Sequence, residues 1–385
     1  MRANSLQNNQ NLIINKGLYT LTLFIILLRK YMITILKADS AALKIVPILF
    51  YGSIILLFIQ FIIRKDHNKT EVILFLISCA LYVFTREGSI LVLILLAISI
   101  RDIEDKYVVK SYFLISLAFI IVCMTMSNFL PFVTQVEESH YRLVRGAYVI
   151  RETFGFGNPN SVFLFSLPIY AAYIFLRFDN YNKYDRILLI VMTVYIYLQT
   201  MSRTGALTII GALIFVDILR AVDLKKYPII SFGIKILPVL FLLLSIVVGT
   251  VLSNFTIFNK ILASRPLHWH AYLVEFGSMF TLFGNKYDEM VTVAHPLDSS
   301  YIYILALLGI VTLVFFLFLI YRGLSIFIEN GQKKYIAVVM IFLIYAFAEN
   351  ILLEVGYNFT IILLIKYVIN NDNGKFTFKE MLKRR

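Results

Sequence analysis

Long apolar runs separated by short polar connectors make up most of this chain. The runs recur about every 25 to 35 residues, and most approach the ~20 residues with which an α-helix crosses the hydrocarbon core of a bilayer. The pattern predicts an all-α, polytopic membrane protein with about twelve transmembrane helices. The predicted spans are 17–36, 43–63, 70–85, 87–100, 110–130, 161–177, 186–200, 204–220, 229–252, 299–321, 334–353 and 355–369.

Composition agrees with this pattern. Of the 385 residues, 60% are hydrophobic and only 15% are charged, and the mean hydropathy of +0.82 is far above that of a soluble domain. We therefore expect one membrane domain over residues 1–385. The first apolar run lacks a clean cleavage site, which favours a retained signal anchor. Cys79 and Cys123 lie inside apolar runs and are expected in the core, not in disulfides or a metal site.

The positive charge of the chain sets a predicted orientation. A formal charge of +13 would suit a nucleic-acid ligand, but Lys and Arg are concentrated in alternate connectors and in the tail after Asn370. The positive-inside rule makes these connectors cytoplasmic and places both termini inside, and no nucleic-acid partner is predicted. The basic connector residues are Arg64, Lys65 and Lys69; Arg101, Lys106 and Lys110; Arg177, Lys183 and Arg186; Arg220, Lys225 and Lys226; and Arg322, Lys333 and Lys334.

Two connectors of the opposite set are long and should form extracytoplasmic loops, over residues 131–160 and 253–298. Connectors of this length are usually functional or disordered. In the first loop, Arg145, Tyr148 and Glu152 have the spacing of one helical face. The second loop opens with apolar residues from Phe255 to Leu262 at roughly helical spacing. This segment is either an interfacial helix or an extension of the preceding span.

Three predicted helices begin at the outer surface, and each start carries capping residues. The starts are Asn158-Pro159-Asn160-Ser161, Ser202-Arg203-Thr204-Gly205 and Asp298-Ser299-Ser300. Asn, Ser and Asp suit the N-cap, and proline suits the first helical turn. Helix N-termini expose unpaired N–H groups and the positive end of the helix dipole, so these starts are candidate anion sites.

Arginines near these starts are the main candidates for binding an anion. Arg203 and Arg265 are predicted to bind phosphate, because a guanidinium matches phosphate oxygens with a bidentate fork at any working pH. The alternatives are an interfacial, snorkelling role for Arg203 and a solvated loop charge for Arg265. Arg145 and Arg151 of the first loop rank lower, since neighbouring glutamates offer them salt bridges.

His295 and Asp298 are the candidate catalytic pair, because a histidine accepts a proton near neutral pH and a carboxylate can orient it. Glu349 is an alternative base or an arginine's counter-charge, and His295 can also be a simple surface histidine. No pair of outer aspartates suggests a metal clamp, so neither metal nor cofactor is predicted. The further substrate-binding candidates are Asn158, Asn160, His268, Trp269, His270 and Tyr301.

The order of these short motifs resembles the capsule and O-antigen polymerase family (Wzy-type), which shares a superfamily with O-antigen ligases. The resemblance covers residues 150–325, and His295 departs from the ligase pattern in being followed by Pro296. The motifs that carry it are Gly155-Phe156-Gly157-Asn158-Pro159-Asn160, Ser202-Arg203-Thr204-Gly205, Ser264-Arg265 followed by Trp269, and His295 through Asp298-Ser299-Ser300-Tyr301 to Gly309-Ile310.

The resemblance implies a GT-C-like glycosyltransferase of the bacterial cytoplasmic membrane. Such enzymes join undecaprenyl-diphosphate-linked oligosaccharides at the outer face, and the expected chemistry is metal-independent and inverting. By resemblance, Arg203 and Arg265 would bind the diphosphate and His295 would be the base. The expected partners are the lipid-linked oligosaccharide, membrane lipids, and a flippase and a chain-length regulator of the same pathway. The alternatives are a transporter of the same lipid or a ligase-like transferase that uses another acceptor.

Overall fold

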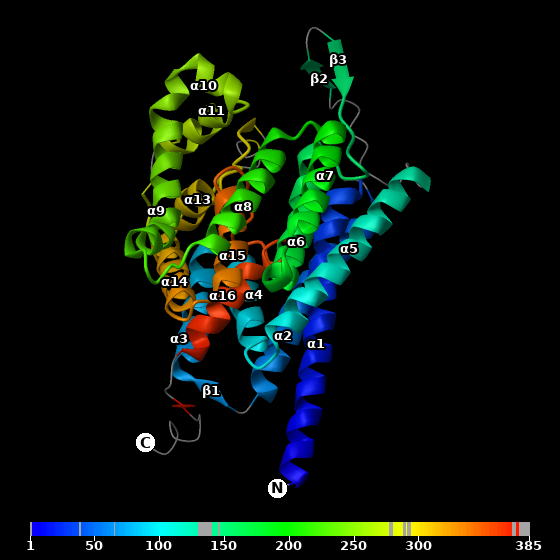
Figure 1. Ribbon diagram of the computed structural model, residues 1–385, viewed down its shortest axis with the longest axis vertical. Coiled ribbons are helices and arrows are strands. Elements are labelled where there is room, and N and C mark those ends of the chain that lie inside the picture. The colour runs from blue at the N-terminus through cyan, green and yellow to red at the C-terminus, as the bar shows by residue number, and fades with distance from the viewer. Residues whose placement is uncertain are drawn as a thin grey trace. The chain divides into compact units, whose positions relative to one another are not determined.

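The computed structural model describes residues 2–37, 40–64, 66–129, 141–144, 147–276, 280–287, 290, 294–371 and 375–376, most of them helical (Figure 1). Seven helical segments in this part of the chain are long and apolar enough to cross a membrane. The predicted class, an all-α membrane protein, is therefore confirmed. The seven segments are Leu12–Ile35, Ala41–Ile63, Asp105–Phe129, Pro159–Asn180, Arg203–Ala221, Pro228–Asn254 and Ser300–Glu329.

The chain divides into two compact units. The first unit contains residues 1–65, 95–217 and 355–359, and in it α1 packs against α2 and α5 while α5 packs along α6. Its helices are α1 (Arg2–Ile35), α2 (Val46–Ile63), α5 (Asp105–Phe129), α6 (Pro159–Arg177), α7 (Lys183–Thr200) and most of α8 (Arg203–Ala221). A β-hairpin, β2 (Tyr141–Val144) with β3 (Ala147–Ile150), precedes α6.

The second unit contains residues 66–94, 218–354 and 360–385. In this unit α9 packs against α11, α13 and α14, and α14 packs against α15. Its helices are α3 (Lys69–Thr85), most of α4 (Gly88–Ser99), α9 (Pro228–Thr250), α10 (Thr256–Ile261), α11 (Arg265–His270), α13 (Ser300–Tyr303), α14 (Gly309–Glu329), α15 (Lys333–Tyr345) and most of α16 (Phe359–Asn370). A two-residue pair joins β1 (His67–Asn68) to β4 (Lys375–Phe376).

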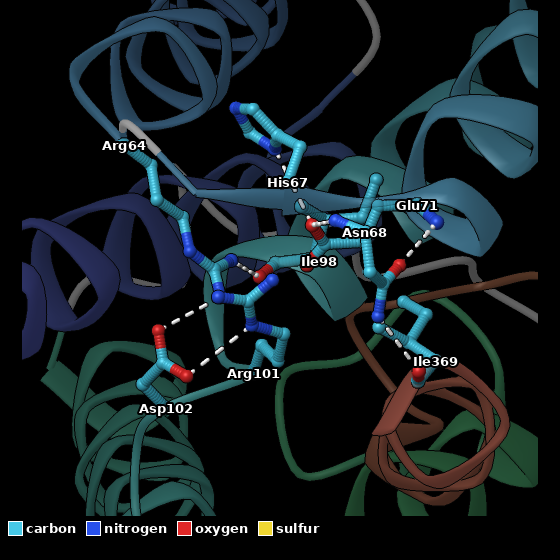
Figure 2. Close-up of polar contacts among 8 residues, drawn as sticks. All are labelled: Arg64, His67, Asn68, Glu71, Ile98, Arg101, Asp102 and Ile369. Atoms are coloured by element: carbon cyan, nitrogen blue, oxygen red, sulfur yellow. Dashed lines mark hydrogen bonds and ion pairs between the residues drawn. The ribbon is translucent and has the colours of Figure 1, made fainter. Parts of the chain in front are cut away.

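Polar residues of the connectors form local networks within each unit (Figure 2). In the first unit, Arg64 binds the Asp102 carboxylate at 2.8 Å and donates to the carbonyl of Ile98 at 2.7 Å, while Arg101 binds the other Asp102 oxygen at 3.2 Å. In the second unit, Asn68 and Glu71 form a capping box that starts α3. Asn68 also donates to the carbonyl of Ile369 at 2.8 Å, which ties α16 to the start of α3.

The span predicted over 299–321 is present as the helical segment Ser300–Glu329, but its regular backbone is interrupted between α13 and α14. Residues Ile304–Leu308 form a π-helical turn, and Gly309 follows with φ 84° and ψ 172°. The segment 281–285 fills the break with backbone hydrogen bonds. Asn285 N–H donates to Ala306 at 3.0 Å, and the N–H groups of Ile310 and Val311 donate to Thr281 and Leu282 at 2.9 and 3.1 Å. A π-helical turn leaves backbone groups unpaired, and this loop satisfies them.

Gly309→Ala is expected to lower the free energy of unfolding by about 2 kcal/mol more than Gly331→Ala. The Gly309 backbone conformation is essentially restricted to glycine, and a Cβ there would collide with the backbone of Gly284 and Leu282. Gly331 also has a positive φ, of 66°, but open space surrounds its Cβ position. Thermal unfolding of both variants in the same detergent measures the difference, and equal losses would show that the close approach at Gly309 is unimportant.

Two further predictions about local structure need correction. The helix predicted over 334–353 ends at Tyr345, so Glu349 lies in a non-helical connection between α15 and α16. The helical face predicted through Tyr148 is wrong, because residues 147–150 form strand β3, paired with Tyr141–Val144. Here strand pairing outweighs helical spacing. Arg145 lies outside the described residues.

Two predicted helix starts are confirmed, those of α6 and α8. Asn158 is the N-cap of α6, its side chain accepts from the Asn160 N–H at 2.8 Å, and Pro159 occupies the first turn. Helix α8 begins at Arg203. The short interfacial segment predicted after α9 is also helical, as α10, and it is separated from α9 by a 3₁₀ turn over Leu252–Asn254. It is therefore not a continuation of the preceding span.

Candidate functional site

Arg265, Asp298 and Glu349 form a charged cluster in the second unit. The Arg265 Nε lies 3.2 Å from Asp298 Oδ2, and its Nη2 lies 2.8 Å from Glu349 Oε1. The side chains of Arg265 and Glu349 are 12% and 14% exposed, whereas that of Asp298 is 37% exposed. The three residues come from α11, from the segment before α13 and from the connection after α15. The guanidinium therefore directs N–H donors at the oxygens of two different carboxylates, which is the geometry that suits anionic ligands.

A sharp turn at the start of α11 positions Arg265. Ser264 adopts a left-handed conformation with φ 63°, its N–H donates to the carbonyl of Asn259 at 2.8 Å, and Pro266 occupies the first turn of the helix. The turn separates α10 from α11. Because α11 is helical, Arg265 and His268 lie one turn apart on the same face.

Ser300 fixes the connection that carries Glu349. Its hydroxyl donates to the carbonyl of Glu349 at 2.8 Å and accepts from the N–H groups of Ile351 and Leu352 at 2.8 and 3.1 Å. Its N–H donates to the carbonyl of Ala346 at 2.9 Å. Ser300 is fully buried, so these bonds replace those that the non-helical backbone would otherwise make with water. A serine at the start of α13 thus holds the glutamate in place.

Burial sets the protonation of the two carboxyl groups. Burial raises the pKa of Asp298, while the nearby Arg265 and His268 oppose that rise. Burial also raises the pKa of Glu349, against the opposing charge of Arg265 and with a further contribution from the negative charge of Asp298. The two carboxyl groups repel each other's ionised forms, so protonation of one favours ionisation of the other.

Two histidines accompany the cluster. The rings of His268 and His295 lie 5.8 Å apart, centroid to centroid, at an interplanar angle of 72°. Burial lowers the pKa of His268, the charges of His295 and Arg265 lower it further, and Asp298 opposes them. His268 is therefore neutral at pH 7 and able to accept a proton. The ring of Phe276 contacts His295 at 5.6 Å, and the Tyr272 hydroxyl donates to the carbonyl of His295 at 2.8 Å.

Other predicted binding residues of the second unit are held inside the protein. The Trp269 ring is 1% exposed and packs edge-on against Phe347 at 5.4 Å. His270 Nδ1 lies 2.9 Å from the Gly249 carbonyl and 3.1 Å from the Ser253 hydroxyl. Tyr301 is buried, and its hydroxyl donates to the carbonyl of Leu343 at 3.0 Å. These contacts stabilise the surroundings of α11 and α13.

The remaining candidates lie in the first unit. Arg151 donates to the carbonyl of Thr200 at 2.7 Å and to the Asn160 side chain at 2.9 Å, which joins the start of α6 to the end of α7. Arg203 is exposed at the start of α8 and forms no ion pair within the described part of the chain. Asn158 serves as the α6 cap. The structure therefore gives Arg151 a structural role and leaves Arg203 accessible.

An apolar cavity of about 180 Å³ lies in the first unit between α5, α6 and α7. Its lining includes Leu117, Phe154, Tyr170 and Tyr195. None of the candidate residues lines it. Its walls are mostly apolar and carry no charged side chain, so the charged cluster of the second unit is the better candidate for a reaction site.

No group of three or more His, Cys, Asp or Glu side chains in the described ranges is arranged to hold a metal ion. No family model, curated protein or solved structure matches the chain. The function is therefore argued from the geometry of the cluster and from the sequence.

Proposed function

We propose that the chain is a polysaccharide polymerase that joins undecaprenyl-diphosphate-linked oligosaccharide repeat units at the outer face of a bacterial cytoplasmic membrane. The observation that carries the proposal is the contact of Arg265, at the start of α11, with Asp298 and Glu349 of two non-helical segments, beside two histidines, in a membrane protein. Charged residues in such proteins are retained chiefly for function. The proposed topology has twelve spans, both termini in the cytoplasm and the cluster in the outer layer.

The proposed reaction transfers the growing chain to a hydroxyl of the incoming repeat unit. The hydroxyl proton passes to a base, and the oxygen forms a bond to the anomeric carbon of the growing chain. The bond between that carbon and the diphosphate oxygen breaks, and its electron pair leaves with the diphosphate. Arg265 is proposed to stabilise the departing charge, with Asp298 and Glu349 holding the guanidinium until the substrate binds. His295 is the base that the family resemblance implies.

A transporter of the same lipid is the second candidate. The break between α13 and α14, filled by the segment 281–285, is the observation that favours it. Interrupted helices form the substrate sites of many secondary transporters. A polymerase does not need such a break. The two candidates also differ in what they do to the lipid, because a polymerase joins its repeat units and a transporter moves it unchanged across the bilayer.

The deciding experiment uses the full-length protein purified in detergent and an undecaprenyl-diphosphate-linked repeat unit extracted from the host. A polymerase converts this lipid to a ladder of regularly spaced products on a gel, with and without a chelator. A ligase-like transferase adds one unit to a separate acceptor and produces no ladder. If vesicles that contain the protein move the lipid across the bilayer without forming a larger product, the chain is a transporter. Lys260→Gln, which changes an exposed residue of α10, is the control for losses of activity during purification and assay.

A further inference from the structure

Two histidine nitrogens beside the charged cluster lack hydrogen-bond partners among the described residues. His268 Nδ1 and His295 Nδ1 are buried and form no hydrogen bond with the described residues. Buried polar atoms in folded proteins are nearly always paired, and an unpaired one costs about 1–3 kcal/mol. Two such atoms on rings whose centroids lie 5.8 Å apart, beside a charged cluster, indicate that a polar ligand atom belongs between the rings.

We propose that His268 and His295 together bind the acceptor hydroxyl, so that His268 is a second catalytic residue of the site. This assignment rests on the proposed function, because it assumes a transferase with a hydroxyl acceptor. One ring accepts the hydroxyl hydrogen, and the other donates an N–H to a lone pair of the same oxygen. When the oxygen bonds to the anomeric carbon, its proton stays on the accepting ring and the diphosphate leaves with the electron pair of the broken bond.

The distance between the rings suits a shared oxygen atom. Two N···O hydrogen bonds of about 2.8 Å to one oxygen hold their nitrogens about 4.5 Å apart. Ring centroids 5.8 Å apart, with an interplanar angle of 72°, allow that separation. The rings are T-shaped, not stacked, and the proposal assigns one nitrogen of each ring to the shared oxygen.

The charges around the pair suit a proton acceptor. The titratable and charged groups that act on His268 are His295, Asp298 and Arg265. Burial and the charges of His295 and Arg265 lower the pKa of His268, which favours its unprotonated form before reaction. Asp298 then stabilises the imidazolium that forms. The carboxylates that contact Arg265 are less suitable bases, since the guanidinium competes for their lone pairs.

The test compares His268→Ala, His295→Ala and the double variant with wild type in the ladder assay. Each single variant is expected to extend chains about 100- to 1,000-fold more slowly, a range typical of a lost general base. Because the two rings act on one proton, the double variant is expected to be no slower than the slower single variant. Losses that multiply would mean that the histidines act independently, and this would overturn the proposal.

Two further readouts separate chemistry from folding. Added imidazole is expected to raise the rate of His268→Ala at least 10-fold above its rate without imidazole. The loss of a merely structural histidine is not rescued in this way. In His295→Gln, removal of the charge that lowers the pKa of His268 should move the acid limb of the pH–rate profile to higher pH. Unchanged rate and profile in both variants would reject the pair. A wild-type protein that forms no ladder would reject the proposed function instead.

Discussion

Arg265→Ala is expected to abolish chain extension, with a loss of at least ~1,000-fold in rate, and to destabilise the protein by ~1–3 kcal/mol. The rate falls because the departing diphosphate loses its guanidinium. The stability falls because Glu349, whose side chain is only 14% exposed, is left as a buried carboxyl without its cation. The rate is measured by the ladder assay and the stability by thermal unfolding in detergent.

A compensated variant separates the two effects of Arg265. Arg265→Met with Glu349→Gln removes the buried charge and its partner together, and Asp298 keeps contact with solvent at 37% exposure. This double variant should regain most of the lost stability and none of the activity. Arg265→Lys keeps the charge and loses the bidentate fork, so it should be intermediate in rate. If the compensated variant polymerises at the wild-type rate, Arg265 is only a counter-ion of Glu349.

The sequence predicted the parts of the structure that depend on local pattern. Apolar runs identified the helices, and Asn158-Pro159 marked the start of α6, because a cap acts on residues two or three positions away. Ser202-Arg203 marked the start of α8, although the Ser202 hydroxyl forms no capping bond with the described residues. The helix ends near Tyr345 and the break at Gly309 were missed. Both depend on tertiary bonds, from the Ser300 hydroxyl and from the segment 281–285, that leave no periodic signal in the sequence.

The sequence identified the residues of the candidate site but not the contacts between them. Arg265, His295 and Asp298 were selected for their chemistry, and Glu349 was recognised as a possible counter-charge. The contact that joins Arg265 to Glu349 spans 84 residues of sequence, and the His268–His295 ring pair bridges two segments of the second unit. Spacing rules reach only one or two helical turns, so they cannot show such contacts. A charged residue near the end of an apolar run was the available signal for Glu349.

Arg203→Ala is expected to slow chain extension about 100- to 1,000-fold while changing the free energy of unfolding by less than about 0.5 kcal/mol. Arg203 is exposed at the start of α8, so its removal leaves no buried partner behind. Its proposed role is to bind diphosphate together with the N–H groups of the first helical turn, where the helix dipole adds to the guanidinium charge.

The matched control for Arg203→Ala is Arg220→Ala, which removes an exposed arginine from the last turn of the same helix. It should leave the ladder unchanged, because a cation at the C-terminal end of α8 cannot act with the N-terminal N–H groups. A rate unaffected by Arg203→Ala would make this arginine an interfacial anchor and leave the diphosphate to Arg265.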